Sequence, residues 1–459
     1  MSSQTNRRTF LKSSAVATTG FWVAGGVAKA QSRSPNEKLN IASVGAGGRA
    51  SSDIGACSGE NIVALCDVSS RRAAKTFNQH PKAKQYKDYR KMLEQEKNVD
   101  AVIVATPDHS HAPASLLAMS LGKHVYCEKP LTKTVYEARL MAEVAAEKNL
   151  ATQMGNQGTS GGGLRQATDW IRAGVLGEVR EVHVWTNRPV WPQGYDAILK
   201  HQGIQAALHG KGEAVSAPPY LDWDLWLGPA AKRPYDPIYA PFTWRGWWDY
   251  GTGALGDMAC HTANLPFMAL NLGAPTSVEA DVSDFNPETY ATWAVIQYEF
   301  PARGDLPPVS YTWYDGGGRK PKKAIDKLTE VVQGEKVSGS GCAIVGSKGT
   351  LYSRDDYGQR NRLLPESKFK DFDPPPRKLP KSPGHHAEWI RACKGGEPAM
   401  SNFSYAGPFT EMVLLGNVAT AVRKKIEWDS KNLEAKNMPE ADEFIRPMYR
   451  NGWELPSLA

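Results

Sequence analysis

The chain has 459 residues, of which 41% are hydrophobic and 22% are charged, a composition typical of globular proteins. Its formal net charge is +7, and the first thirty residues supply +4 of it, leaving +3 for the rest. The charge of that remainder is spread without long basic blocks. This argues against a nucleic-acid partner, because such a partner requires a clustered basic face.

Residues 1–30 have the pattern of a twin-arginine export signal. Arg7 and Arg8 precede the uncharged run "SSAVATTGFWVAGGVA", and "AKA" at the end of the segment forms a small-x-small cleavage site. The apolar run is shorter than the roughly 20 residues of a membrane span, and no later segment is apolar enough to cross a bilayer. We expect export to the periplasm or another extracytoplasmic space, cleavage after Ala30 and a linker over 31–37. An amphipathic helix or a membrane anchor remains the alternative.

The run "LNIASVGAGGRA" predicts a buried strand, a glycine turn and the start of a helix. Gly45 allows the tight turn, Gly47 lets the backbone approach a pyrophosphate, and the third fingerprint position is the small residue Ala50. Gly48 and Arg49 open the helix, whose free N–H groups favour phosphate. We therefore expect Gly45, Gly47, Gly48 and Arg49 to bind a dinucleotide.

A second strand, "NIVALCDV", ends in Asp67, about twenty residues after the fingerprint. A carboxylate in that place accepts hydrogen bonds from the ribose hydroxyls of the adenosine and repels a 2′-phosphate, so NAD is favoured. NADP remains the alternative because Arg71 and Arg72 follow closely. A nucleotide-free α/β turn with an accidental acid is the simpler interpretation of the same residues.

The segment "VDAVIVATPDHSHAPASLLAMSLGKHVYCEKP" continues the alternation of strands and helices, which predicts a parallel, doubly wound sheet with right-handed crossovers. Ligands bind beyond the carboxyl ends of such strands. Residues at those ends are therefore candidates for cofactor contact: Thr106, Pro107, His111, Glu128 and Lys129. Residues i and i+2 at a helix start do not face the same way, so we expect His109 and His111 to cap or pack rather than bind a metal.

Asp257 and His261 in "GDMACHTANL" are separated by one helical turn and project from one face. Histidine has a reference pKa of about 6.5 and accepts a proton near neutral pH. Asp257 then contacts the substrate or steadies the imidazolium. The spacing also fits a capping Asp and a packed His, and a metal site would need a third ligand that the sequence does not show. The six cysteines form no C-x-x-C pair, and we expect them to be small buried residues.

These motifs together resemble the glucose–fructose oxidoreductase, inositol dehydrogenase and MocA (Gfo/Idh/MocA) family. The resemblance rests on "SVGAGGRA", the acid of "LCDV", "TPDHSHAP", "EKP" and "GALGDMACHTAN", the last being similar to the family's D-x-x-x-H helix. The segments "DLWLGPA", "WRGWWDYGTGALGDM", "LLGNVA" and "YRNGWEL" further resemble exported bacterial members with an enlarged C-terminal domain. The match covers nearly all of the chain after residue 30.

The resemblance implies an N-terminal Rossmann domain over 38–157 and a C-terminal α/β domain over 158–459 with a large, mostly antiparallel sheet. It implies oxidation or reduction of a sugar or cyclitol hydroxyl with NAD(P), and association into dimers or tetramers through that sheet. Lys129 would stabilise negative charge on the reacting oxygen, next to a cis Lys129–Pro130 bond. Glu128 would contact the nicotinamide ribose, His261 would be the general base, and Asp257 an orienting group.

Two further groups of residues are candidates for ligand contact. Asn156 and Gln157, just after the Rossmann strands, are candidates for cofactor contact. Many relatives carry a basic residue there, so the charge preference for the substrate stays open. Aromatic faces with interspersed polar groups suit a sugar, which nominates Trp185, Asn187, Arg188, Arg245, Trp247, Asp249 and Tyr250. Domain cores and subunit interfaces use the same residue types.

The leading interpretation is an exported NAD-dependent oxidoreductase acting on a carbohydrate or cyclitol hydroxyl. One alternative keeps NAD but uses transient oxidation of the sugar to drive glycoside cleavage; relatives that do so carry a different motif in place of "GDMACH". The other alternative is a non-catalytic sugar-binding protein, and the intact Lys129, Asp257 and His261 argue against it.

Overall fold

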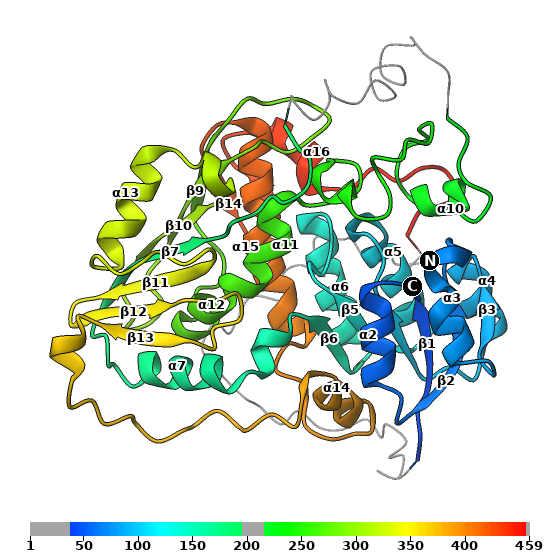
Figure 1. Cartoon of the computed structure of the whole chain (residues 1–459), viewed down its shortest axis with the longest axis horizontal. Coiled ribbons are helices and arrows are strands. Elements are labelled where there is room, and N and C mark those ends of the chain that lie inside the picture. Colours follow the sequence, from blue (N-terminus) through cyan, green and yellow to red (C-terminus); the bar gives the residue numbers. More distant parts are fainter. Residues whose placement is uncertain (1–36, 195–214, 456–459) are drawn as a thin grey trace, which may run out of the picture.

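The computed structural model describes residues 37–194 and 215–455, in which two sheet-containing halves lie side by side (Figure 1). The first half contains a six-stranded parallel sheet in the order β3-β2-β1-β4-β5-β6. Its strands are β1 (Asn40–Val44), β2 (Asn61–Cys66), β3 (Lys84–Tyr86), β4 (Ala101–Val104), β5 (His124–Glu128) and β6 (Thr152–Gly155). Its helices are α2 (Arg49–Ala56), α3 (Ser70–Gln79), α4 (Tyr89–Gln95), α5 (His111–Ser120) and α6 (Val135–Glu147).

This strand order is that of the dinucleotide-binding Rossmann fold. Strand β4 is buried at every position, as expected for a strand covered by helices on both faces, and its sequence "AVIV" is a continuous apolar run. Strands β2 and β3 are added on one side of β1, and β4, β5 and β6 on the other. In such sheets the point between β1 and β4, where the strand order switches, has a crevice beyond the carboxyl ends of the strands. The glycine turn after β1 and the "TPDHSH" segment after β4 lie at that crevice.

The second half contains a nine-stranded sheet in the order β13-β12-β11-β7-β10-β9-β8-β14-β15. Every neighbouring pair is antiparallel except β7 and β10. The strands are β7 (Val179–Trp185), β8 (Ser277–Val282), β9 (Ala294–Phe300), β10 (Val309–Tyr314), β11 (Gly341–Gly346), β12 (Gly349–Ser353), β13 (Asn361–Leu364), β14 (Ile426–Asp429) and β15 (Glu434–Ala435). The predicted fold class, a Rossmann sheet followed by a large mostly antiparallel sheet, is confirmed.

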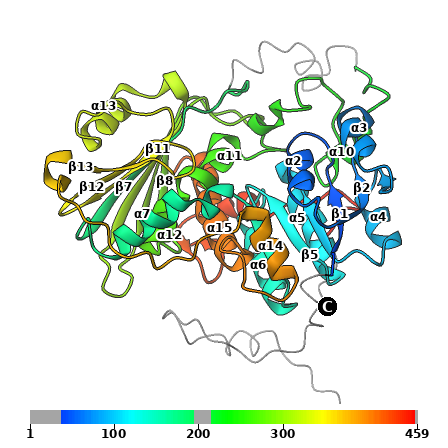
Figure 2. The ribbon, with the colours of Figure 1, turned by 60° about the horizontal axis from the view of Figure 1, so that its bottom comes forward.

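Alternation along these strands divides the side chains between two helical layers. Val184 and Trp313 face the main core with α7 (Gly162–Arg172), α11 (Gly253–Thr262), α12 (Asn264–Leu270) and α15 (Phe403–Val422). Their chain neighbours Trp185 and Tyr314 point to the opposite face and pack under α13 (Lys322–Val331). Figure 2 shows α13 on one side of this sheet and α7, α12 and α15 on the other.

Helix α15 joins the two halves. It packs against α6 and β6 of the first half and against α11, β8 and β9 of the second, and it lies between the two sheets in Figure 1. The later helix α14 (His385–Cys393) returns to the first half, where the fully buried Trp389 packs with Ile41, Ile103 and Tyr126. Helix α14 comes late in the chain, yet it completes the core of the first sheet. The domain boundary at residue 157 therefore stays a prediction.

The expectation that the six cysteines are buried is confirmed, and all six are free. The segment "CAIVGSKGTLYS" forms the β11–β12 hairpin. Across residues 37–194 and 215–455 no helix is both long and apolar enough to cross a membrane. The remaining short elements are α10 (Trp223–Leu227), α16 (Asp442–Ile445) and the 3-10 turns η2 (Asp108–Ser110), η3 (Gln157–Ser160), η4 (Thr243–Gly246), η5 (Gly317–Arg319), η6 (Glu366–Phe369) and η7 (Pro439–Ala441).

Candidate active site

The turn between β1 and α2 is built so that only glycine fits. Gly45 and Gly48 have φ values of 93° and 61°, in the region that side chains disfavour. A Cβ on Gly45 would lie 2.5 Å from the carbonyl oxygen of Ala105, and one on Gly47 would lie 2.7 Å from that of Arg72. The turn thus has no room for side chains at these positions, as the dinucleotide fingerprint requires, so the residues present fit a dinucleotide.

Asp67 lies directly behind this turn. Its Oδ2 accepts hydrogen bonds from the N–H groups of Ala46 (2.9 Å) and Gly47 (3.1 Å), and its Oδ1 accepts one from Ser69 (2.8 Å). The carboxylate therefore braces the glycine turn, a role that sequence reasoning missed. Its predicted contact with the adenosine ribose remains a prediction, and Arg72, whose guanidinium lies against Gly48, keeps NADP open as the alternative.

Arg49 at the start of α2, Glu128 at the end of β5 and Gln157 at the start of η3 meet at one point. Arg49 Nε donates to Glu128 Oε1 at 3.0 Å, and Gln157 Nε2 donates to the same oxygen at 2.9 Å. Burial, followed by the nearby charge of Asp53, raises the pKa of Glu128 to about 7. The structure thus brings together three residues that the sequence nominated separately for cofactor contact.

Three side chains of the "TPDHSH" segment, those of Asp108, His109 and His111, are buried and contact other segments of the chain. The hydroxyl of Thr252, at the start of α11, donates a hydrogen bond to Asp108 Oδ2 at 2.7 Å. His109 has its ring nitrogens 3.2 and 3.1 Å from the carbonyl oxygens of Tyr250 and Trp226. His111 likewise lies 2.9 and 2.7 Å from those of Thr106 and Pro130. Both imidazoles are occupied by backbone, as the packing interpretation predicts, and the described residues contain no group of metal-ligating side chains.

The burial and contacts of these and neighbouring side chains change the expected role of several residues. His111 is 1% exposed and holds the loop of Lys129 from behind, so its side chain offers no surface to a cofactor. Asn156 is fully buried and joins the end of β6 to α11 through the carbonyl of Cys260 at 3.4 Å. The hydroxyl of Thr106 donates a hydrogen bond to the carbonyl of Pro107 at 3.2 Å. We therefore correct the prediction that the side chains of His111 and Asn156 contact the cofactor. Both are buried and support neighbouring segments of the site.

Lys129 and Asp257, 128 residues apart in the chain, form an ion pair across the two halves. Lys129 Nζ lies 2.7 Å from Asp257 Oδ1 and 2.6 Å from its main-chain oxygen. The Lys129–Pro130 bond is cis, as the resemblance implies. Arg245 Nε approaches the same Asp257 oxygen at 3.4 Å, while its guanidinium stacks over Trp244 and Phe242.

The charges of this pair are fixed by their surroundings. Burial acts to lower the pKa of Lys129, but the attraction of Asp257 outweighs it and holds that pKa above its usual value. Burial likewise acts to raise the pKa of Asp257, and the charges of Lys129 and Arg245 overcome it, giving a pKa of about 2. At neutral pH Lys129 is therefore an ammonium and Asp257 a carboxylate.

His261 lies one turn beyond Asp257 on α11 and is only 6% exposed. Its Nδ1 is buried and has no hydrogen-bond partner in the described part of the chain. Burial, reinforced by the charge of Lys129, places the pKa of His261 well below 6.5. The imidazole is thus neutral at neutral pH and able to accept a proton, and the positive charge of Lys129 acts on it.

The predicted sugar-contacting residues divide into three groups. Arg245 reaches the site through Asp257. Trp247 and Tyr250 are 1% and 0% exposed and belong to an aromatic core with Trp226 and Tyr239, so their predicted substrate contact is wrong. It is also wrong for Trp185, which is 1% exposed and packs under α13 on the far face of the sheet from α11.

The remaining three candidates make other contacts. Asp249 pairs with Arg233 at 2.8 Å. Arg188 donates a hydrogen bond to the side chain of Asn187, and its carbonyl accepts one from Gly316 at 2.8 Å. None of these contacts leads to Lys129 or His261, so a substrate role for Asn187, Arg188 and Asp249 stays a prediction.

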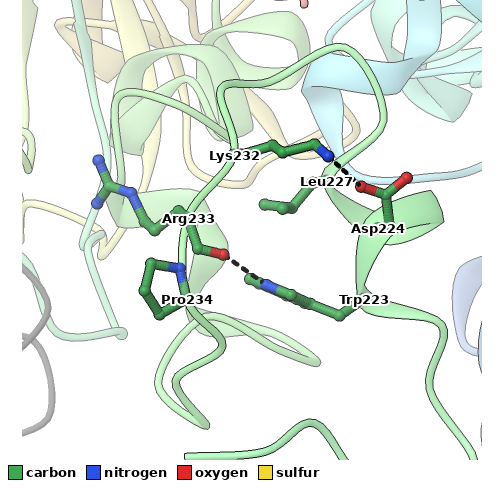
Figure 3. Close-up of a pocket in the computed structure, with 6 residues that line it drawn as sticks. All are labelled: Trp223, Asp224, Leu227, Lys232, Arg233 and Pro234. Carbon is green, nitrogen blue, oxygen red and sulfur yellow. Dashed lines mark hydrogen bonds and ion pairs between the residues drawn. The ribbon is translucent and has the colours of Figure 1, made fainter. Parts of the chain in front are cut away.

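Two pockets lie away from the candidate active site. Figure 3 shows one of about 330 Å³, lined by Trp223, Asp224, Leu227, Lys232, Arg233 and Pro234. Its Trp223 indole N–H donates to the carbonyl of Arg233 at 2.8 Å. A second, of about 760 Å³, lies between α13 and the face of the nine-stranded sheet that α13 covers. Neither is lined by Lys129, Asp257 or His261.

The fold and this constellation define a two-domain dinucleotide-binding protein, and comparison with known families agrees. Residues 39–156 match the oxidoreductase family with an NAD-binding Rossmann fold, and residues 192–305 match the C-terminal α/β domain of the same family. Together the two matches cover just over half of the chain. The chain therefore belongs to the Gfo/Idh/MocA family of oxidoreductases, as its motifs predict, and its first domain is the family's NAD-binding domain.

Individual relatives are more distant. The chain is 32% identical to inositol 2-dehydrogenase from Salmonella typhimurium over 129 residues, which are 28% of this chain and 38% of that protein. It is 26% identical to levoglucosan dehydrogenase from Pseudarthrobacter phenanthrenivorans over 203 residues, 44% of this chain and 40% of that one. The alignments thus span less than half the length of these relatives.

Solved structures support the fold over a longer stretch. An inositol dehydrogenase homologue from Azotobacter vinelandii, crystallised with NADH and myo-inositol, matches with a TM-score of 0.54 at 18% identity. That match covers 86% of this chain and 98% of the homologue. The WlbA dehydrogenase from Bordetella pertussis, in complex with NADH and UDP-GlcNAcA, gives a TM-score of 0.58 at 16% identity, with 86% and 99% coverage.

Proposed function

We propose that this protein is an exported NAD(P)-dependent oxidoreductase that transfers a hydride between nicotinamide and a hydroxyl carbon of a sugar or cyclitol. The observation that carries the proposal is the 2.7 Å pairing of Lys129 with Asp257, one helical turn from a buried, neutral His261. The names of the relatives, inositol 2-dehydrogenase and levoglucosan dehydrogenase, support the substrate class.

The roles follow from the protonation states. Oxidation of an alcohol requires removal of the hydroxyl proton as hydride leaves the carbon, and bound nicotinamide supplies the hydride acceptor. Neutral His261 accepts the proton, and the Lys129 ammonium donates a hydrogen bond to the oxygen on which negative charge develops. Asp257 holds the ammonium in place and keeps it protonated. Arg49 and Gln157 fix the buried Glu128 beside the cofactor turn.

A substrate panel tests this function. Mature protein, mixed with NAD or NADP and with myo-inositol, levoglucosan and common aldoses, is expected to produce reduced nicotinamide, followed by absorbance at 340 nm. We expect the greater rate with NAD, because Asp67 disfavours a 2′-phosphate. Cleavage of glycosides without net reduction would instead support the glycosidase alternative. Sugar binding without either reaction would support the non-catalytic one.

We further propose that the protein is exported by the twin-arginine pathway as a folded homo-oligomer that carries its nucleotide. The signal-like residues 1–30 support export. Exposed residues on β8 and β9, among them Glu279, Asp281, Gln297 and Glu299, leave part of the large sheet open for association. Native mass spectrometry of protein recovered from the periplasm is expected to show a chain that begins at Gln31, a dimer or tetramer, and bound NAD. Protein that is found only in the cytoplasm, as an uncleaved monomer without nucleotide, would refute all three.

A further inference from the structure

The loop between β12 and β13, residues 354–360, brings one aromatic side chain to the candidate catalytic base. The ring of Tyr357 meets that of His261 edge-on, with centroids 4.9 Å apart and planes at 71°. Tyr357 is nevertheless 41% exposed, in contrast to the buried tryptophans and tyrosines that the sequence nominated for substrate contact. No motif marks this residue in the sequence.

The loop holds Tyr357 in a fixed place. The Asp355 carboxylate accepts hydrogen bonds from the N–H groups of Tyr357 (2.8 Å), Gln359 (3.1 Å) and Arg360 (2.6 Å). Gln359 Oε1 in turn accepts one from the N–H of Gly163 at 3.1 Å, which ties the loop to the start of α7. The ring is therefore positioned before any ligand arrives, which is what a binding surface requires.

The loop also touches the segment that carries the cofactor residues. A Cβ on Gly158 would lie 3.1 Å from the carbonyl oxygen of Tyr357, so the two backbones are in direct contact there. Gly158 follows Gln157, which binds Glu128. Tyr357 thus stands between the His261 side of the site and the cofactor side. Within residues 37–194 and 215–455, no group forms a hydrogen bond with its hydroxyl.

We propose that Tyr357 is a substrate-contacting residue, whose ring forms the wall against which the apolar C–H face of a pyranose or cyclitol ring packs. The inference rests on the proposed function and names the contact that orients its substrate. An exposed aromatic ring offers a flat apolar face at little entropic cost, and carbohydrate rings present matching C–H patches. Packing on this wall turns the reacting hydroxyl toward His261 and Lys129.

The test compares Tyr357→Ala and Tyr357→Phe with Arg360→Ala, an exposed side chain on the same loop whose ion pair with Asp355 is 3.6 Å long. For the best sugar of the panel we expect Tyr357→Ala to raise KM about tenfold or more, the scale of one lost aromatic contact. Tyr357→Phe retains the ring and is expected to keep KM within about twofold of wild type. Arg360→Ala should do the same, and the Kd for NAD should not change in any of the three.

A merely structural role would give a different pattern. If Tyr357 only packs on His261, the alanine variant lowers kcat at unchanged KM, and that result overturns the inference while leaving the proposed function intact. Saturation-transfer NMR with myo-inositol or D-glucose gives a readout without turnover. Binding that is lost in Tyr357→Ala supports the wall even if no sugar is oxidised, and equal binding by both proteins refutes it.

Discussion

Replacing Lys129 by methionine is expected to lower kcat by about 10²–10³-fold, the usual cost of removing one donor to a developing oxyanion. The variant loses the ammonium that lies 2.7 Å from Asp257, and with it the hydrogen bond to the reacting oxygen. The Kd for NAD is expected to stay close to that of wild type, because the glycine turn and the Arg49–Glu128 contact are untouched. Stopped-flow measurement of hydride transfer and a titration of NAD separate the two quantities.

Stability needs its own control in this experiment. Removal of Lys129 leaves Asp257 buried, with Arg245 at 3.4 Å as its remaining cationic partner among the described residues. Breaking a buried pair typically costs about 3–5 kcal/mol. The double variant Lys129→Met/Asp257→Asn removes both charges and is expected to recover much of the free energy of unfolding without recovering activity. Wild-type turnover in either folded variant would exclude Lys129 from the mechanism.

Replacing His261 by alanine is expected to lower kcat by about 10²–10⁴-fold, the range associated with loss of a general base. The side chain leaves a space in a site that is otherwise buried, so added imidazole is expected to restore part of the rate above pH 7. An orphaned Nδ1 indicates that the ring is not held by a structural hydrogen bond, which makes rescue a fair test of chemistry rather than of folding. Full activity without imidazole would refute the assignment.

The pH dependence has a defined sign. Protonation of His261 abolishes its function as a base, and burial places its pKa well below 6.5. As far as His261 is concerned, kcat/KM should therefore stay level as the pH falls through 6.5 and decline only at lower pH. A decline near pH 7 is expected from Glu128 or Asp108 instead, since burial raises the pKa of each to about 7.

The variants Glu128→Gln and Asp108→Asn assign such a decline. If it belongs to one of these carboxyl groups, it disappears in the matching variant. A decline at or above pH 6.5 that survives in both would contradict the low pKa of His261. The lowered pKa of His261 also affects stability. When the pH falls below about 6.5, His261 takes up a proton in the unfolded chain but not in the folded one. The free energy of unfolding therefore decreases as the pH falls below that value.

The first half of the molecule was predictable because its signals are local. A buried apolar run followed by Gly45 and Gly47, an acid about twenty residues on, and repeated strand–helix alternation all lie in unbroken stretches of sequence. The alternation predicts a parallel, doubly wound sheet, because such units have a known handedness. The same holds for Asp257 and His261, whose spacing alone places them on one helical face. These predictions needed no knowledge of what packs against what.

The tryptophans and tyrosines show where local signals end. Trp185, Trp247 and Tyr250 have the composition of a sugar site, yet each is buried in an aromatic core. Trp185 lies on the α13 face only because of strand register, since its neighbour Val184 faces the main core. Register is set by pairing with β10 and β11, more than a hundred residues away, so composition could not decide it.

By itself, the sequence determined that the chain binds a dinucleotide on a Rossmann sheet, that a lysine stands at the end of one strand, and that an aspartate and a histidine share one turn of a helix. Only the tertiary structure decided that Lys129 and Asp257 meet, which backbone carbonyls the rings of His109 and His111 face, and that Tyr357 reaches His261. The physical reason is range. Backbone geometry and hydrophobic periodicity act within a few residues, whereas an ion pair between residues 128 positions apart depends on how two sheets and α15 pack together.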